Sequence, residues 1–322
     1  MKKPKTPAGA WPELPPGPIL RATTDTLQLW TQILGKVTLA RSPWINHSWH
    51  VTLRVSARGL TTPLVPNGAT AFSIELDFVG HELVIRATDG GERRVPLQAE
   101  SVAWFYGELM GALADLGAPT EIDIVPSELP DPVVAFPDDV TPRAYDPAVA
   151  RAYWQALVQC QRVFTRFRSC FLGKVSPIHL FWGGFDLAVT RFSGRRAPLH
   201  PGGIPHLPDS VTREAYSHEV SSAGFWPGGR GVEAPSFYSY AYPTPGGFPA
   251  AKVGPPAAAF DTALGEFLLP YDEVRTAADP DEALLSFLQT TYAAAADLGR
   301  WDRAALECEE GRIGRPRQVR RS

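Results

Sequence analysis

One pattern of segments occurs twice along this chain, and this repeat constrains the fold more than any other feature. A helical pattern that ends with ILGKV at residues 33–37 leads into a strand-like run at 50–59, and another that ends with FLGKV at 171–175 leads into a strand-like run at 185–194. Self-similarity over such a long period indicates related structural units. We therefore predict two pseudo-symmetric α-β-β-β-α halves with a cleft at the seam between them; the alternative is chance similarity between two α+β stretches.

The composition is that of a globular protein and argues against several functions. Of the 322 residues, 44% are hydrophobic and 20% are charged, which suits a buried core and not a disordered chain. The net charge of −3 argues against a general affinity for nucleic acid or for anionic membranes. No apolar run approaches the length of a membrane span, so no membrane partner is expected.

Two further features point to a cytoplasmic location. Prolines follow the N-terminal lysines, where a signal peptide would have an apolar stretch. The three cysteines, Cys160, Cys170 and Cys308, are odd in number and lack the spacing of a metal site. Free thiols in a reducing compartment are the simplest interpretation.

Proline and glycine divide the chain. The 32 prolines and 28 glycines are concentrated at 1–18, 126–147 and 196–256. The last cluster predicts long loops, where binding and catalytic groups tend to lie. The predicted organisation is an extended proline-rich arm at 1–18, a first α+β half at 19–126, a proline-rich linker at 127–146, a second α+β half at 147–306 and a basic, disordered tail at 307–322.

Local signals place the helices within the two halves. Asp146, which precedes a proline, predicts a helix start, and Asp279 with Glu282 three residues later predicts another. The Gly-Lys pairs at 35–36 and 173–174 are typical of helix ends with a cation beside them.

Strands are predicted where apolar and polar residues alternate, at 50–56, 74–78, 216–223 and 237–242. A turn at 79–81 predicts a hairpin. Neighbouring strands of this kind favour antiparallel sheets flanked by helices, and hence an α+β fold.

Three segments hold more reactive side chains than a sheet requires: NHSWH at 46–50, IHLFWGGFD at 178–186 and REAYSHEVSSAGFW at 213–226. Imidazole is a ligand for zinc, iron and manganese, so His47, His50 and His218 are candidate ligands of a divalent metal. His47 and His50 can reach one ion only from a loop, because residues three apart on a strand face opposite sides. None of the established metal-binding motifs is present, and the alternative is that these histidines are buried hydrogen-bonding groups.

The same segments also allow acid–base catalysis without a metal. His218 is the candidate acid or base, Asp186 or Glu214 the carboxylate that orients it, and His50 an assisting group. The sequence lacks the G-x-S-x-G motif of serine hydrolases, so any triad is assembled across the fold. The alternative is an internal polar network that joins the two halves.

Aromatic residues and arginines near these segments predict a surface that binds an organic molecule. Aromatic rings bury the apolar body of a ligand, and guanidinium groups bind a carboxylate or phosphate. The candidate pocket residues are Trp49, Arg54, His179, Trp182, Arg191 and Tyr240. Such surfaces also stack single-stranded nucleic acid, which the negative net charge disfavours, and the alternative is an ordinary core.

Five stretches carry a resemblance to a known family: LWTQILGKV at 29–37, 46–50, ARGLTT at 57–62, FWGGFDLAVTRFSGR at 181–195 and EAYSHEVSSAGFWPG at 214–228. At these residues the chain resembles an uncharacterised bacterial family of unknown function, over about residues 11 to 306. The resemblance implies one compact unit and no particular activity.

Together these patterns predict a cytoplasmic enzyme that acts on a small organic molecule, anions included, in a cleft between the halves, with zinc, iron or manganese as the candidate cofactor. The alternatives are a non-catalytic small-ligand-binding protein and a protein-interaction module. The expected cleft residues are His47, Trp49, His50, His179, Trp182, Asp186, Glu214, His218 and Tyr240.

Overall fold

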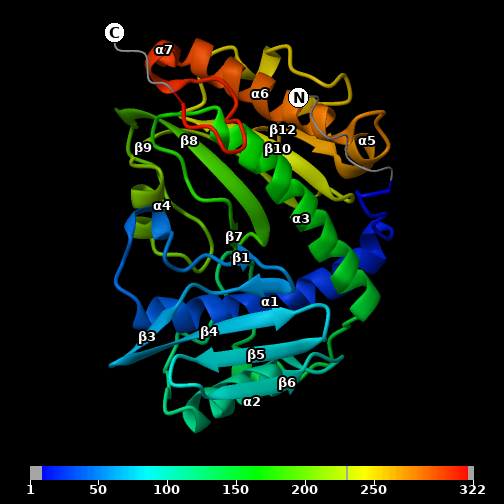
Figure 1. Ribbon diagram of the computed structural model, residues 1–322, viewed down its shortest axis with the longest axis vertical. Coiled ribbons are helices and arrows are strands. Elements are labelled where there is room, and N and C mark those ends of the chain that lie inside the picture. Colours follow the sequence, from blue (N-terminus) through cyan, green and yellow to red (C-terminus); the bar gives the residue numbers. More distant parts are fainter. Residues whose placement is uncertain (1–8, 230, 318–322) are drawn as a thin grey trace.

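Two antiparallel sheets of six strands each, flanked by helices, form the fold in the computed structural model, which describes residues 9–229 and 231–317 (Figure 1). The protein is therefore α+β, as the alternation of apolar and polar residues predicted. The two sheets lie toward opposite ends of the long axis of the molecule.

The first half contains the sheet β1-β2-β4-β5-β6, in which β3 also pairs with β4. Its elements are α1 (Gly17–Arg41), η1 (Asn46–Ser48), β1 (Arg54–Val55), β2 (Gly59–Thr61), β3 (Val65–Asn67), β4 (Thr70–Asp77), β5 (Glu82–Ala87), β6 (Glu92–Pro96) and α2 (Val102–Asp115).

The second half contains the sheet β11-β12-β10-β9-β8-β7 and follows a linker that includes η2 (Phe136–Asp138). Its elements are α3 (Pro147–Ser169), β7 (His179–Phe181), β8 (Asp186–Arg196), α4 (Asp209–Ala215), β9 (His218–Trp226), β10 (Ser236–Tyr242), η3 (Phe248–Ala250), β11 (Ala259–Asp261), β12 (Glu266–Pro270), α5 (Tyr271–Arg275), α6 (Pro280–Leu298) and α7 (Arg303–Leu306).

The edge strands β1 and β7 join the two sheets. Just before β1, Leu53 donates to the carbonyl of Leu180 in β7 (3.0 Å), and the amide of Leu180 donates back to Leu53 (2.9 Å). Each half has a long helix before its strands and another after them, and each sheet has more strands than the three we predicted.

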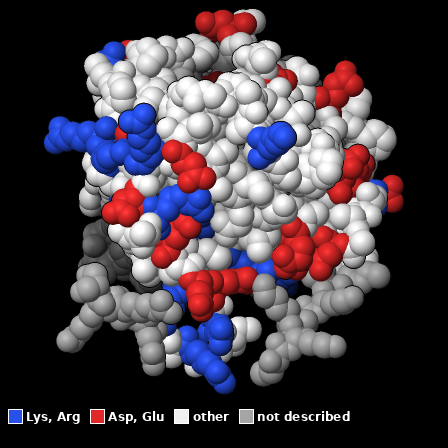
Figure 2. Space-filling model, turned by 90° about the horizontal axis from the view of Figure 1, so that it is seen from above, with Lys and Arg blue, Asp and Glu red and all other residues white. Residues whose placement is uncertain are grey.

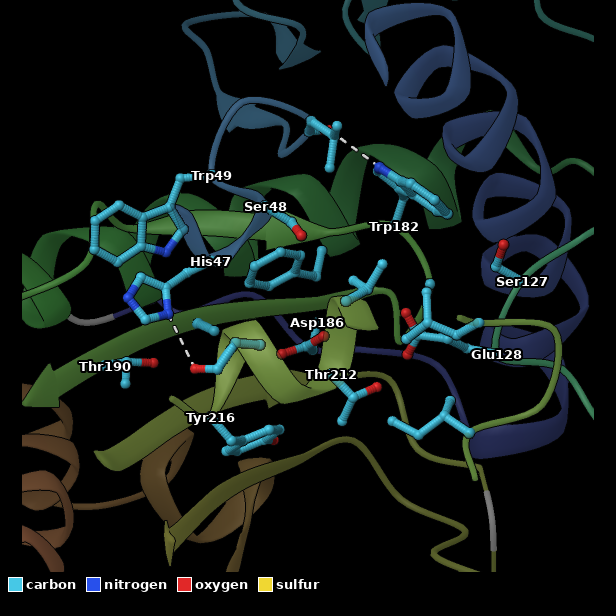
Figure 3. Close-up of a pocket in the computed structure, with 18 of the residues that line it drawn as sticks. His47, Ser48, Trp49, Ser127, Glu128, Trp182, Asp186, Thr190, Thr212 and Tyr216 are labelled. Atoms are coloured by element: carbon cyan, nitrogen blue, oxygen red, sulfur yellow. Dashed lines mark hydrogen bonds between the residues drawn. The ribbon is translucent and has the colours of Figure 1, made fainter. Parts of the chain in front are cut away.

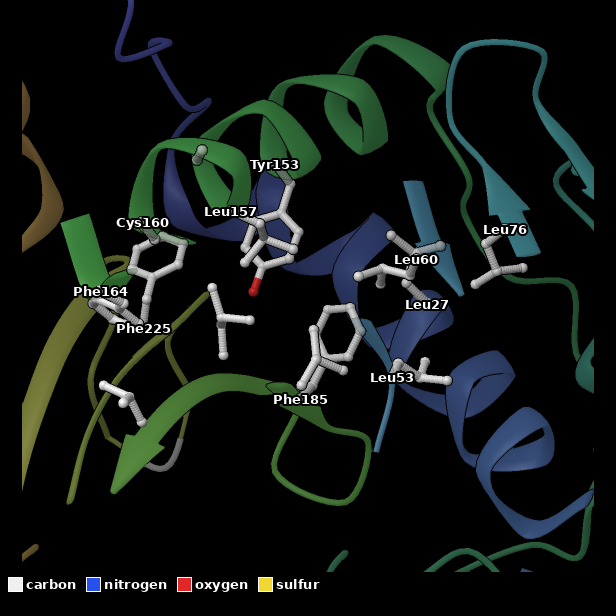
Figure 4. Packing of buried hydrophobic residues seen from close by; sticks show 14 of the residues in the cluster. Leu27, Leu53, Leu60, Leu76, Tyr153, Leu157, Cys160, Phe164, Phe185 and Phe225 are labelled. Carbon is white, nitrogen blue, oxygen red and sulfur yellow. The ribbon is translucent and has the colours of Figure 1, made fainter. Parts of the chain in front are cut away.

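A single cluster of buried hydrophobic residues extends through both halves. Figure 4 shows Tyr153 of α3 beside Phe185 and Phe225 of the second half, with Leu53 and Leu60 of the first half close by. The helix α3 contacts strands of both sheets. Because the halves share one core, they form one compact unit.

The predicted helix starts are confirmed. The side chain of Asp146 accepts from the backbone N–H groups of Ala148 and Val149, and that of Asp279 accepts from Glu282. These bonds satisfy amide donors that have no partner within the helix.

The predicted helix end at 35–36 is wrong, because α1 continues to Arg41. Gly35 lies in the interior of the helix, where a β-carbon would overlap the indole of Trp182. Glycine is therefore needed there for close packing rather than for a cap. The second pair, at 173–174, lies beyond the end of α3 at Ser169.

Two predicted strands are also wrong in extent. Within 50–59, only Arg54–Val55 and the first residue of β2 are strand, because the chain bends at 57–58 between β1 and β2. The strand predicted at 216–223 begins only at His218, because the helix α4 ends at Ala215 and the chain turns at 216–217.

The ends of the described chain pack against the second half. Trp11 is buried, donates from its indole nitrogen to Asp281 (3.1 Å) and contacts the rings of Phe237 and Tyr271. Near the other end, Glu310 pairs with Arg166 of α3 (2.8 Å). Residues 1–8 of the predicted arm and 318–322 of the predicted tail lie outside the described residues.

Candidate functional site

A cavity of about 430 Å³ lies between the two halves (Figure 3). The first half contributes α1 and the segment around η1, the linker contributes Ser127 and Glu128, and the second half contributes the β7–β8 turn, three strands and the segment 197–217 that joins β8 to β9. This volume suits a small organic ligand.

One face of the second sheet forms a wall of the cavity. Alternate residues along a strand point to the same side, so Ala188, Thr190 and Phe192 of β8 face the cavity while Leu187 and Val189 are buried in the core. In the same way β9 contributes Val220 and Ser222, and β10 contributes Tyr238 and Tyr240.

Five of the predicted site residues line this cavity. They are His47, Trp49, Trp182, Asp186 and Tyr240. The other six, His50, Arg54, His179, Arg191, Glu214 and His218, are not among its lining residues.

The predicted pairing of Glu214 with His218 is not formed. Glu214 accepts instead from the indole N–H of Trp44 (2.5 Å), which lies near the start of η1. His218 Nδ1 is bonded to the hydroxyl of its neighbour Ser217 (3.1 Å). The carboxylate that was expected to orient His218 therefore holds α4 against the first half.

His50 and His179 are buried outside the cavity. His50 Nδ1 accepts from the backbone N–H of Ile45 (3.2 Å), and its ring packs against Trp44. Burial, reinforced by the nearby charge of Arg54, lowers the pKa of His179 to about 3. Both rings therefore behave as structural groups.

The predicted anion-binding arginines also lie outside the cavity. Arg54 donates to the hydroxyl of Thr52 (2.8 Å). The guanidinium of Arg191 is 3.5 Å from the ring centroid of Phe167 and 4.3 Å from that of Tyr292, and burial lowers its pKa to about 10. Arg191 shares its strand face with Leu187 and Val189, which explains its place in the core.

The histidines predicted as metal ligands do not form a cluster. Within residues 9–229 and 231–317, no three His, Cys, Asp or Glu side chains are arranged so that they could hold a metal ion. The ligand set His47, His50 and His218 is therefore not assembled.

His47 lines the cavity as a neutral ring. Its Nδ1–H donates to the carbonyl of Ala215 (3.0 Å), so Nε2 carries the lone pair and accepts from the ammonium of Lys174 (2.5 Å). Burial is the largest cause that lowers the pKa of His47, and Lys174 lowers it further. The ring packs between Trp49 and Phe192, with centroids 5.0 and 4.8 Å away.

Most hydroxyl groups on the sheet wall are bonded to one another. Tyr216 and Tyr240 share a hydrogen bond (2.8 Å), as do Thr190 and Ser222 (2.8 Å). Tyr238 donates to a carboxylate oxygen of Asp186. Burial raises the pKa of Tyr216 to about 12, so its phenol is neutral at physiological pH.

Two hydroxyl groups differ from these. Ser48 and Thr212 both line the cavity, are 8% and 2% exposed, and have hydroxyl oxygens without a hydrogen-bond partner among the described residues. Figure 3 shows them on either side of Asp186. Buried polar groups are rarely left unpaired in proteins, so these positions point to an absent partner.

Strained backbone is concentrated around the cavity. Seven non-glycine residues of the described chain have positive φ angles, and four of them, His47, Ser48, Glu128 and His206, line the cavity. Such conformations cost free energy and tend to occur at functional sites.

The segment 197–217 covers the cavity and is fastened to the linker and the first half. Pro205 accepts from the backbone N–H of Glu128 (2.9 Å), and His206 bonds to Asp131 (2.8 Å). The segment supplies Thr212 and Tyr216, which the sequence analysis did not select. The proline and glycine cluster at 196–256 was the available signal.

Comparison with known proteins identifies the family. Residues 11–308 match the model of a family of unknown function, DUF5996. The chain belongs to the DUF5996 family. No curated protein and no solved structure matches this DUF5996 chain. No helix of its described residues is long and apolar enough to cross a membrane.

Proposed function

We propose that this protein binds a small organic molecule in the cavity between its halves. The observation that carries the proposal is the cavity itself, with its aromatic lining, buried hydroxyls and strained backbone. Ligand sites are typically concave and mostly apolar, with a few polar groups that orient the ligand. A protein-interaction module would instead expose a large apolar surface.

The lining favours a neutral ligand over an anion. Lys36 is the one lysine or arginine among the described lining residues, and it is bonded to Asp123 (2.6 Å) and to the carbonyl of Val125 (2.7 Å). The arginines Arg54 and Arg191 lie elsewhere, and Lys174, which bonds to His47 (2.5 Å), is not among the lining residues. The described lining therefore offers an anionic group no unpaired cation.

Catalysis on the bound molecule is the second candidate function. Asp186 lines the cavity and accepts from Tyr238, so a carboxylate and a phenol lie together beside the ligand space. In this pair Asp186 is the candidate base, and Tyr238 orients it by donating its only hydroxyl hydrogen to it. In an enzyme, Asp186→Asn abolishes turnover and leaves ligand binding measurable.

The partner and location proposals follow from charge and cysteine chemistry. Figure 2 shows basic and acidic side chains intermixed on one face, with no extended basic area, which argues against nucleic acid. The three cysteines are free, which supports a cytoplasmic location.

The similar order of elements in the two halves supports an origin by internal duplication.

Filling the cavity tests the proposal. Ala188 faces the cavity from β8, so Ala188→Phe blocks it, whereas Ala250→Phe adds the same ring at an exposed site. We expect small molecules extracted from the denatured wild-type protein and from Ala250→Phe, identified by mass spectrometry, to be missing from Ala188→Phe. Identical extracts from all three folded proteins, together with no response of the cavity tryptophans to added small molecules, would contradict the proposal.

A further inference from the structure

We infer that the ligand is a neutral heteroaromatic molecule that bonds to the hydroxyls of Ser48 and Thr212 through polar atoms on opposite edges of its ring system. This inference rests on the proposed function, because it assumes that the cavity is a ligand site.

Ser48 and Thr212 are the two lining residues whose buried hydroxyls lack a hydrogen-bond partner among the described residues. The other hydroxyls of the sheet wall are already bonded to one another or to Asp186. The hydroxyls of Ser48 and Thr212 are buried and have no partner among the described residues. A buried hydroxyl without a partner loses its bonds to water and gains none in return, so a ligand that supplies the partner is favoured.

The two hydroxyls are held by one rigid junction. Ser48 is in η1 with a φ of 58°, and Thr212 is in α4. The bond from His47 to Ala215 (3.0 Å) ties η1 to α4 next to both residues. Because the junction fixes their positions, the two hydroxyls select ligands by the spacing of polar atoms.

The rest of the cavity lining favours a ligand with a planar ring system. Aromatic rings reach the cavity from both halves, including Trp49 of the first half and Trp182, Phe192 and Tyr240 of the second. Aromatic pairs favour stacked or edge-to-face contacts, which suit a planar ring system. A planar hydrocarbon would fill this space but would leave both hydroxyls unpaired.

The groups nearest the two hydroxyls favour a neutral ligand over an anion, because the carboxylate of Asp186, which accepts from Tyr238, lies between them. Hydroxyls can donate or accept, so they bond ring nitrogens, amino groups and carbonyl groups alike. His47 has both ring nitrogens occupied, and the phenols are protonated at physiological pH. Heteroaromatic rings offer these polar atoms without carrying a charge.

Two probes of nearly equal shape test the inference. Naphthalene has no polar atom, whereas 1,5-naphthyridine has a nitrogen acceptor on each of two opposite edges. Dissociation constants are measured from the fluorescence of the cavity tryptophans in the wild type, Ser48→Ala, Thr212→Val and the double variant. Thr291→Val is the matched control, because Thr291 is buried in α6 and its hydroxyl is bonded within the helix (2.8 Å).

We expect each single variant to weaken the binding of 1,5-naphthyridine about fivefold, the value of one hydrogen bond, and the double variant to weaken it about 25-fold. The binding of naphthalene should stay unchanged in all three. Thr291→Val should leave the dissociation constants of both probes unchanged. Equal effects of Ser48→Ala and Thr212→Val on the two probes, or no effect on either, would overturn the inference and leave the proposed function standing. Failure of both probes to bind the wild type would overturn this inference as well, and the extraction experiment with Ala188→Phe would then decide the proposed function separately.

Discussion

Leu53 and Leu180 exchange both of their backbone hydrogen bonds across the seam, at 3.0 and 2.9 Å. Each residue lies at the edge of its own sheet, and both are fully buried. A reciprocal pair of this kind is the antiparallel unit that also holds strands together within a sheet. The two sheets are therefore joined by the same interaction that stabilises each of them.

This pair should make the seam as stable as the rest of the core. We expect the amide hydrogens of Leu53 and Leu180 to exchange with solvent as slowly as those of β4 and β9, within about 1 kcal/mol of opening free energy. Hydrogen exchange followed by NMR measures this directly. Much faster exchange of these two amides would mean that the halves separate without unfolding.

Packing of Trp182 on α1 makes Gly35 irreplaceable. Alanine is normally preferred over glycine inside a helix, but a β-carbon at Gly35 would overlap the Trp182 indole, which also donates to Val51 (3.0 Å). We expect Gly35→Ala to lower the free energy of unfolding by about 1–3 kcal/mol in urea titrations.

The matched control for this change is Gly107→Ala in α2, where the added carbon has no atom within 4 Å outside the adjoining residues and the backbone of its own helix. That variant should raise the free energy of unfolding by about 0.5–1 kcal/mol. If both alanines were stabilising, the close contact between α1 and Trp182 would not exist in solution.

The sequence predicted the features that depend on neighbouring residues. The cap at Asp146 needs only the amides two and three positions later, and the alternation in β8 and β10 needs only the period of a strand. The same period could have placed Arg191, because it shares its face with Leu187 and Val189. We predicted Arg191 as a pocket residue because of its charge, although the strand period places it in the core.

The cavity depends on contacts between distant segments, which local patterns do not encode. Tyr216 and His218 are two residues apart, yet only Tyr216 lines the cavity, because Tyr216 directly follows the end of α4 at Ala215 and is not in β9, which begins at His218. The bond that turns α4 toward η1 joins His47 to Ala215, far away in the sequence. Ser48 and Thr212 were missed for the same reason.

Buried histidines should make the protein less stable in mild acid. Burial lowers the pKa of His179 from 6.5 to about 3, so between these values the unfolded chain binds a proton that the folded protein does not. The free energy of unfolding therefore falls as the pH drops below 6.5, by at most about 1.4 kcal/mol per pH unit for this residue. Burial lowers the pKa values of His47 and His50 as well, which adds to the slope in the same direction.

The variant His179→Phe isolates the contribution of this residue. Urea titrations at several pH values between 7.5 and 5 should give a shallower slope for the variant, whatever its absolute stability. Parallel slopes for the two proteins would mean that His179 takes up a proton in the folded state as readily as in the unfolded chain.

The unpaired hydroxyl of Thr212 leads to an unusual expectation for stability. Valine has nearly the same shape as threonine, so Thr212→Val removes a buried hydroxyl that has no partner among the described residues. In protein freed of ligand, the free energy of unfolding should stay the same or rise by up to about 1 kcal/mol. Thr291→Val is the control, since it removes a hydroxyl that bonds to Phe287 (2.8 Å), and it should cost about 1 kcal/mol. Urea titrations measure the free energy of unfolding of the two variants. An equal loss in both would show that the Thr212 hydroxyl already has a hydrogen-bond partner in the unliganded protein. The hydroxyl would then not be available to a ligand.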